Sequence, residues 1–309
     1  MVIVIMKNTS TLEPSGVLIV NKHAGATSHD IVNKVRRLYN TKRVGHAGTL
    51  DPMATGVLVV LVGRAVKASE YAHTADKTYR ATLKLGLVSD TEDITGKCEN
   101  TGKPISDEQT VINACQSMLG RSMQIPPMYS AIKQDGKKLY ELAREGVTVE
   151  RQAREIEVYS IDTQKIADDE YVIDCKVSKG TYIRTLCTDI GAKCGCGAVM
   201  ASLERTNAGG FDLSEAHTIE ELSELDHDTL ITLLMPTEQL FSEYPVVTLD
   251  EFFYKLCYSG CEIYQKKIKT THPVGQYVRL YNKDGFFGLG KVREYEAGTA
   301  IKCEKLFVL

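Results

Sequence analysis

One segment of the chain concentrates residue types that can support catalysis. Residues 45–56 read GHAGTLDPMATG, with three glycines, one proline and no hydrophobic periodicity. The glycines permit positive φ and let a ligand approach the backbone closely, and Pro52 restricts the chain directly after Asp51. We therefore expect a loop that holds one carboxylate rigidly between two apolar elements.

The residue types in this loop are compatible with more than one role for Asp51. An Asp before Pro in a glycine-rich turn commonly caps that turn. Metal binding has little support, because His46 is the only other ligand type in the loop and the nine cysteines include no C-x-x-C pair. A phosphate cradle has little support either, since no Gly-Lys-Ser/Thr follows. We predict no metal site.

The net charge of −3 conceals an uneven distribution. Residues 206–254 contain eleven acids and no Lys or Arg, whereas the rest of the chain carries 37 bases and 29 acids. Residues 31–70 alone hold seven bases against two acids. This pattern indicates either a basic face that meets a polyanion or an ordinary solvated helix face rich in Lys and Arg.

Nothing in the sequence suggests a membrane or secreted protein. Apolar runs such as 57–62 are far shorter than the roughly 18 residues of a membrane span. The first ten residues lack the charged-then-apolar pattern of a signal peptide. We expect a cytoplasmic protein whose cysteines are reduced structural thiols.

Hydrophobic periodicity predicts the elements that must position the loop. Ser28 is a candidate cap for a helix whose apolar residues Ile31, Val32, Val35 and Leu38 share one face. Further helices are predicted over 65–72, 107–119, 137–145 and 183–194. Strands are predicted over 16–21, 57–62, 78–87, 154–161 and 170–177. Glycine-punctuated strands over 275–309 predict a small β-rich module, so we place a domain boundary near Tyr244 and expect domains 1–244 and 245–309.

Five segments of the chain resemble the TruB family, the bacterial tRNA pseudouridine-55 synthases. They are 16–22 (GVLIVNK), 45–52 (GHAGTLDP), 76–80 (DKTYR), 124–133 (QIPPMYSAIK) and 178–185 (SKGTYIRT). They stand in the family's order and at roughly its spacing. Together with the region of Leu203 they span about residues 16 to 210.

The resemblance implies a fold and a reaction. The fold is α+β: a catalytic domain on a mixed, mostly antiparallel sheet, followed by a small PUA-like β-barrel that binds RNA. The reaction converts uridine 55 in the T loop of tRNA to pseudouridine, by base flipping, cleavage of the N1–C1′ bond and reattachment through C5. The family uses no cofactor and no metal. A tRNA partner, no protein partner and a monomer are expected.

The resemblance also assigns two residues to the reaction centre. Asp51 matches the catalytic carboxylate, which acts at the ribose where positive charge develops. Arg184 matches the arginine that pairs with this carboxylate. A bidentate partner of this kind would orient Asp51 and lower its pKa.

Further matches supply a base pocket and an RNA surface. Tyr79 matches the tyrosine that lies against the target uracil, and Tyr182 and Leu203 match positions that complete the pocket. His46 matches the histidine that fills the space of the flipped base. Cations near these motifs are candidate phosphate contacts: Lys22, Arg43, Arg64, Lys67, Lys133 and Lys179. Glu204 departs from the pattern, because the family commonly carries Leu-Arg-Arg-Thr where this chain has Leu-Glu-Arg-Thr.

Three rival hypotheses remain at this point. A pseudouridine synthase for another RNA, such as a guide-dependent type, is disfavoured because the chain lacks long basic tails. A glycosidase normally needs two carboxylates on one sugar, and only Asp51 lies in such a motif. A non-catalytic RNA-binding or chaperone protein is disfavoured by the combined presence of Asp51, Tyr79 and Arg184.

Overall fold

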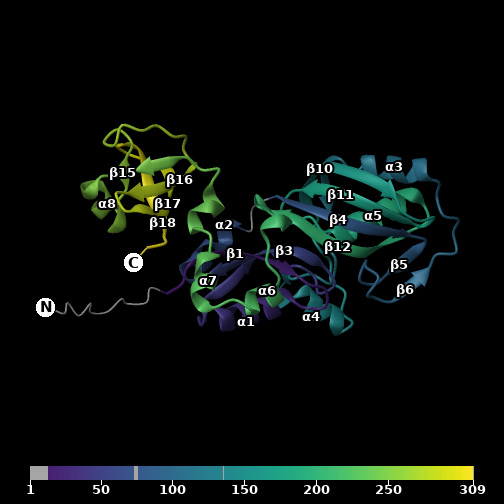
Figure 1. The fold of residues 1–309 in the computed structure, drawn as a ribbon. Coiled ribbons are helices and arrows are strands. Elements are labelled where there is room, and N and C mark those ends of the chain that lie inside the picture. Colours follow the sequence, from purple (N-terminus) through teal and green to yellow (C-terminus); the bar gives the residue numbers. More distant parts are fainter. Residues whose placement is uncertain (1–12, 73–75, 135, 309) are drawn as a thin grey trace.

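The structure is a computed structural model that describes residues 13–72, 76–134 and 136–308, and its larger sheet forms the body of the protein (Figure 1). The strand order is β1-β3-β12-β4-β11-β10-β7, with β2 beside β3 and β13 beside β12. β12 runs parallel to β3, and the other neighbours in this sheet are antiparallel. The body is therefore α+β with a mixed sheet. Within the described residues, no helix is both long and apolar enough to cross a membrane.

The elements of the body have the following bounds. The strands are β1 Gly16–Lys22, β2 Val44–Ala47, β3 Thr55–Val62, β4 Lys77–Leu85, β5 Leu87–Ser89, β6 Cys98–Asn100, β7 Gly120–Gln124, β8 Lys133–Gln134, β9 Lys137–Lys138, β10 Arg154–Lys165, β11 Glu170–Val177, β12 Ala198–Ala208 and β13 Phe211–Asp212. The helices are α1 Ser28–Leu38, α2 Ser69–Ala72, α3 Glu108–Gln116, α4 Leu139–Arg144, α5 Ile183–Cys194, α6 Ile219–Ser223 and α7 His227–Thr232, with 3-10 turns η1 Gly63–Ala68, η2 Leu213–Glu215 and η3 Thr237–Phe241.

Two local expectations need correction. The glycine-rich segment is not one loop, because its first residues belong to β2 and its last to β3, which leaves 48–54 as the irregular part. Thr27 rather than Ser28 caps α1: Thr27 has extended φ and ψ and shares a capping box with Asp30. Ser28 is the first helical residue and is buried, and its hydroxyl instead holds the backbone of Leu50.

Other predicted segments are interrupted in the structure. The segment 65–72 is divided between the end of a 3-10 turn, up to Ala68, and one short α-helical turn from Ser69. The strand predicted over 78–87 ends at Leu85, because Gly86 takes φ of 80°, and β5 begins after it. The helix over 183–194 has the predicted bounds.

The core explains why β1 and β3 are nearly continuous hydrophobic runs. On one face, Leu18 and Leu58 belong to a large buried cluster that extends to residues of α1, α3 and α5. On the other face, Val17 and Val59 pack with Ala65 and its neighbours in η1. Both faces of these strands are buried, so apolar residues are required at every position. The rigid strand pair β1–β3 is the base from which the loop 48–54 projects.

The C-terminal part forms a second sheet that stands apart from the body in Figure 1. Its elements are β14 Val246–Thr248, α8 Glu251–Tyr258, β15 Ile263–Tyr264, β16 Tyr277–Asn282, β17 Gly285–Tyr295 and β18 Gly298–Leu306, and the strand order is β14-β16-β17-β18-β15. An apolar cluster joins this sheet to the body, with Ala68 and Phe241 on one side and Leu289 and Phe307 on the other.

Candidate active site

The loop 48–54, which we call the catalytic loop, is fixed by polar and apolar anchors. The Ser28 hydroxyl donates to the carbonyl of Leu50 at 3.1 Å and accepts from its amide at 2.9 Å. The Lys22 ammonium donates to the carbonyl of Pro52 at 3.2 Å. The side chains of Leu50 and Ala54 are buried in the main core. Asp51 is thus presented between fixed points, with its side chain 34% exposed.

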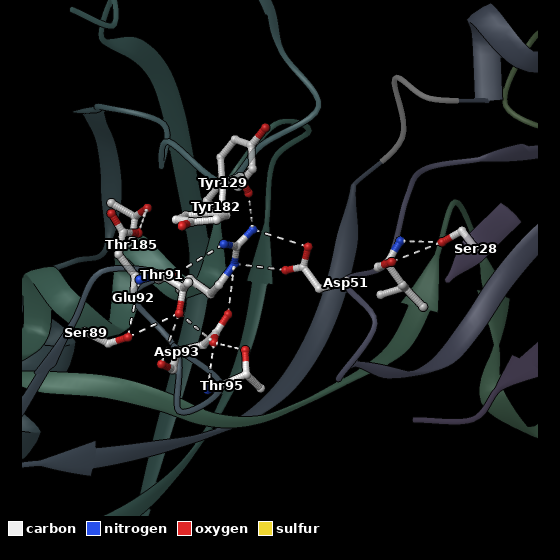
Figure 2. Close-up of polar contacts among 12 residues, drawn as sticks. Ser28, Asp51, Ser89, Thr91, Glu92, Asp93, Thr95, Tyr129, Tyr182 and Thr185 are labelled. Carbon is white, nitrogen blue, oxygen red and sulfur yellow. Dashed lines mark hydrogen bonds and ion pairs between the residues drawn. The ribbon is translucent and has the colours of Figure 1, made fainter. Parts of the chain in front are cut away.

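Arg184 grips the Asp51 carboxylate with two nitrogen atoms. Its Nε lies 2.9 Å from Oδ2 and its Nη2 lies 3.2 Å from Oδ1 (Figure 2). The guanidinium also donates to the carbonyls of Thr91 at 3.2 Å and Tyr129 at 2.9 Å. Arg184 is the second residue of α5 and its side chain is only 5% exposed. A rigid, buried fork of this kind fixes both the position and the orientation of the carboxylate.

A second carboxylate, Asp93, lies behind Arg184. Its Oδ2 is 3.9 Å from Arg184 Nε, and its Oδ1 accepts hydrogen bonds from the Thr95 amide at 2.9 Å and hydroxyl at 2.6 Å. The preceding residue, Glu92, has φ of 65° and accepts a 2.5 Å hydrogen bond from Thr185 at the start of α5. Such backbone strain is maintained only where surrounding contacts enforce it. The loop 89–96 therefore supports Arg184 through Asp93, near the same Nε that contacts Asp51, and through the Thr91 carbonyl.

The environment of Asp51 corrects the expected direction of its pKa. Burial of the carboxyl raises the pKa of Asp51 above its ordinary value. Arg184 opposes this shift, the Asp93 carboxylate adds to it, and Lys22 opposes it. Arg184 does act in the predicted direction, but burial of the carboxyl outweighs it.

We expect Asp93→Asn to shift the acid limb of the reaction to lower pH. The family resemblance implies that Asp51 acts in its ionised form, so we expect activity to rise as pH increases through its pKa. Removing the negative charge of Asp93 takes away one contribution that raises this pKa. The pH profile of kcat/KM measures the shift. Movement of the limb to higher pH would contradict this arrangement of charges.

The residues predicted to line the base pocket, Tyr79, Tyr182 and Leu203, lie on β4, just before α5 and on β12. Tyr79 on β4 is paired across the strands with Arg205 on β12, which pairs in turn with Gly56 at the start of β3. Tyr79 and Leu203 are mostly buried, at 7% and 8% exposure. Tyr182 immediately precedes α5, where Gln124 binds both its amide and its carbonyl. Figure 2 shows Tyr182 on the same side of the arginine–aspartate pair as Tyr129.

The structure separates the candidate phosphate contacts into groups. Lys22 is fully buried and donates to three backbone carbonyls, so this prediction is corrected: burial makes it an anchor of the loop. Burial also lowers the pKa of Lys22 to about 8. Lys67 donates to the carbonyl of Leu306 at the junction with the second sheet. Arg43 is exposed but pairs with Glu13 at 2.9 Å.

Three candidate cations remain at the surface, and two other positions can be placed. Lys133 and Lys179 are exposed, and Arg64 is half-buried on η1.

His46 lies on β2 opposite Val60, rather than in the irregular loop. Glu204 is half-buried on β12 and faces Arg80 across the strands.

Sequence reasoning missed the residues that act through Arg184. Asp93 does not lie in a motif whose function can be interpreted from the sequence alone. A usable signal is the largely polar run SDTEDITG over 89–96, which begins two residues after the strand predicted over 78–87. Such a run is typical of a tight, internally hydrogen-bonded loop.

Comparison with known proteins identifies the family. A model described as the TruB family pseudouridylate synthase N-terminal domain matches residues 36–183, and one described as the tRNA pseudouridylate synthase B C-terminal domain matches residues 184–242. A tRNA pseudouridine synthase B from Clostridium tetani is 41% identical over 282 residues, which cover 90% of this chain and 95% of that protein. The chain belongs to the TruB family.

Other TruB relatives and solved structures agree with this assignment. Proteins called tRNA pseudouridine synthase B from Alkaliphilus oremlandii and Neisseria meningitidis are 44% and 39% identical, and each match covers at least 90% of both chains. Among solved structures, a Cbf5-Nop10-Gar1 complex contains a chain that matches with a TM-score of 0.72 at 24% identity, over 96% of this chain and 85% of that one. This structural likeness establishes the fold of the TruB body.

Proposed function

We propose that the protein converts uridine 55 in the T loop of tRNA to pseudouridine. The single observation that carries this proposal is the Asp51 carboxylate, partly open to solvent and held by both nitrogen atoms of a buried arginine. Membership of the TruB family supports tRNA as the substrate. The choice of position 55 rests on the resemblance of the five motifs.

The geometry of the site suits chemistry at a ribose. As the N1–C1′ bond breaks, positive charge develops on the sugar, and a fixed carboxylate beside it stabilises that charge. Asp51 then reacts with the sugar, by addition to C1′ or by removal of the C2′ proton; both routes need its ionised form. The freed uracil turns and bonds to C1′ through C5. In the first route the bond between Asp51 and C1′ breaks as this bond forms, and in the second the abstracted proton returns to C2′. The C5 proton is then lost and N1 gains a proton, so the net reaction is an isomerisation.

The pocket residues act on the base in this proposal. A stacked loop hides the glycosidic bond, so the nucleotide must be flipped out at a cost of a few kcal/mol. Tyr79 offers an aromatic face to the uracil, Leu203 and Tyr182 complete the pocket, and His46 occupies the vacated space. Asp51, Tyr79 and Arg184 are the proposed catalytic residues.

The reaction needs neither metal nor cofactor in this proposal. In the ranges 13–72, 76–134 and 136–308, no three His, Cys, Asp or Glu side chains gather in a way that could hold a metal ion. Carboxylate chemistry with net isomerisation consumes no redox equivalents. A cytoplasmic monomer with no obligatory protein partner is the form we propose for the enzyme.

Residues 245–309 are proposed to be an RNA-binding, PUA-like domain, and residues 1–244 the catalytic domain. The five-stranded second sheet, with α8 packed against it, is compatible with a small curled barrel. All proposed reaction residues lie in the body, so this domain would contribute remote binding of tRNA. Uniform binding of that kind lowers KM without acting on the transition state.

We expect tRNA binding to weaken steeply with salt despite the net charge of −3. Each phosphate contact contributes about 0.7 to 0.9 to the negative slope of log K against log salt. Lys179→Ala, at the turn before α5, should therefore reduce the slope by nearly 1. Filter binding over a salt series measures this. Lys103→Ala, an exposed lysine in the loop after β6, is the control and should leave the slope unchanged. A wild-type slope near zero would contradict the proposed RNA surface.

Loss of the C5 proton gives a direct test of the proposed reaction. An unmodified tRNA transcript labelled with tritium at C5 of uridine should release one tritium per modified nucleotide. Transcripts that lack uridine at position 55 should release none. Tritium release that is independent of this uridine would overturn the assignment of position 55.

A further inference from the structure

Arg205 is a buried cation on β12, and it contacts the backbone on both sides of the catalytic loop. Its side chain is among the largest fully buried ones, with the residue 1% exposed. Nε donates to the carbonyl of Val57 at 2.7 Å, and Nη2 donates to the carbonyl of Gly48 at 3.1 Å. No carboxylate of the described residues lies within ion-pair distance of Arg205. The guanidinium is therefore satisfied chiefly by the carbonyls of Gly48, in the loop, and of Val57, in β3.

The backbone of Arg205 is pressed against the same loop. Arg205 pairs with Gly56 in the parallel β12–β3 contact. Gly56 has φ of 96°, and a Cβ there would lie 2.3 Å from the Arg205 carbonyl oxygen. At the other end, a Cβ on Gly48 would lie 3.4 Å from Arg205 Nη1. Glycine is therefore required at position 56, where the backbone meets Arg205. At position 48 the distance to Arg205 is an ordinary contact, and the φ of 93° is what favours glycine there.

The contacts of Arg205 differ in kind from the other loop anchors. Ser28 and Lys22 hold points within the loop, at Leu50 and Pro52, from the side of β1 and α1. Arg205 instead links Gly48, the first residue of the loop, to Val57 in β3, the strand that follows the loop. It does so from β12, which lies on the other side of β3 from β1. Asp51 lies in the segment between the two carbonyls that Arg205 holds, so these contacts restrict how far the backbone around Asp51 can move relative to Arg184.

We propose that Arg205 is a positioning residue, whose guanidinium closes the ends of the catalytic loop and thereby sets Asp51 against Arg184 and the ribose. This inference rests on the proposed function of the site. A planar guanidinium spans two carbonyls at fixed angles, whereas an ammonium is a compact point charge. A lysine there would also add a third amine beside the buried Lys22 and the half-buried Lys77. Burial already lowers the pKa of each of these two to about 8, and the charge of Arg205 adds to this effect.

The test compares Arg205→Lys and Arg205→Met with a matched control. Arg80→Met removes an exposed arginine from the neighbouring strand, where it pairs with Asp174. Three quantities are measured for each protein: the single-turnover rate at saturating tRNA, the Kd for tRNA, and hydrogen exchange over residues 48–57. Thermal melting establishes that each variant is folded.

We expect both Arg205 variants to lose about 10²-fold in rate at saturating tRNA, the loss typical of a misplacement near 1 Å. Their Kd should stay within about threefold of wild type, because Arg205 is buried away from phosphates. Exchange should rise over 48–57 and not elsewhere. Arg80→Met should change neither the rate at saturation nor the exchange.

Other outcomes separate this inference from the proposed function. If folded Arg205 variants keep the wild-type rate, or lose affinity for tRNA in proportion to rate, the positioning role is wrong. If both variants unfold, Arg205 is needed for the fold and the positioning role is likewise overturned. If the wild-type protein itself releases no tritium from tRNA, the failure lies in the proposed function and not in the role of Arg205.

Discussion

Asp51→Asn should leave a folded protein that binds tRNA and forms no measurable pseudouridine. The substitution keeps the shape of the side chain and removes the charge that the reaction at the ribose requires. We expect a loss of at least about 10⁴-fold in single-turnover rate, as is usual when the reacting group itself is removed. The Kd for tRNA should change by no more than a few-fold, because binding depends mainly on phosphate contacts.

The measurement requires protein free of host enzyme, so the variant is purified from a strain without its own pseudouridine-55 activity. Asp168→Asn is the matched control. Its side chain is fully exposed beside Lys165, and its removal should leave the rate unchanged. Turnover by the Asp51 variant within 10²-fold of wild type would remove this carboxylate from its proposed role.

Arg184→Lys should have the second-largest effect, about 10²- to 10³-fold on the rate at saturation. A lysine keeps one positive charge but cannot bind both oxygens of Asp51 while donating to the carbonyls of Thr91 and Tyr129. It would also leave Asp93, 7% exposed in its side chain, with a poorer partner. Rapid-quench single-turnover kinetics measure the loss.

The control for this variant is Arg121→Lys. Arg121 forms an exposed pair with Glu157 on the sheet edge, where salt bridges contribute little, so neither rate nor stability should change. Equal activity of Arg184→Lys and wild type would show that a single positive charge is sufficient and that the bidentate contact between Arg184 and Asp51 has no catalytic role.

Local patterns predicted part of the fold correctly for identifiable reasons. The helix over 183–194 has strong apolar spacing and ends at Gly195 with φ of 81°, so both its period and its stop signal are visible in the sequence. The sequence patterns predict no strand over 198–208, although β12 occupies this segment and lies between β3 and β4 in the sheet. Its sequence, AVMASLERTNA, mixes small, apolar and charged residues, and its contacts rather than its period determine that it is a strand.

The candidate site also has features that the sequence predicts and features that it does not. The Asp51–Arg184 contact joins residues 133 positions apart, and only the family resemblance connected them in the sequence. The burial of Lys22 could not be predicted, because a lysine after a strand is ordinarily exposed and here the loop folds over it. The upward direction of the Asp51 pKa depends on desolvation, which no sequence motif reports.

Position-resolved mapping of pseudouridine in an unmodified tRNA transcript tests the central claim most directly. The purified protein is incubated with the transcript in excess chelator, and every uridine is then assayed at single-nucleotide resolution. We predict stoichiometric pseudouridine at position 55 and at no other uridine, with none formed by the Asp51→Asn variant. Modification elsewhere, or none by the folded wild-type protein, would contradict the account.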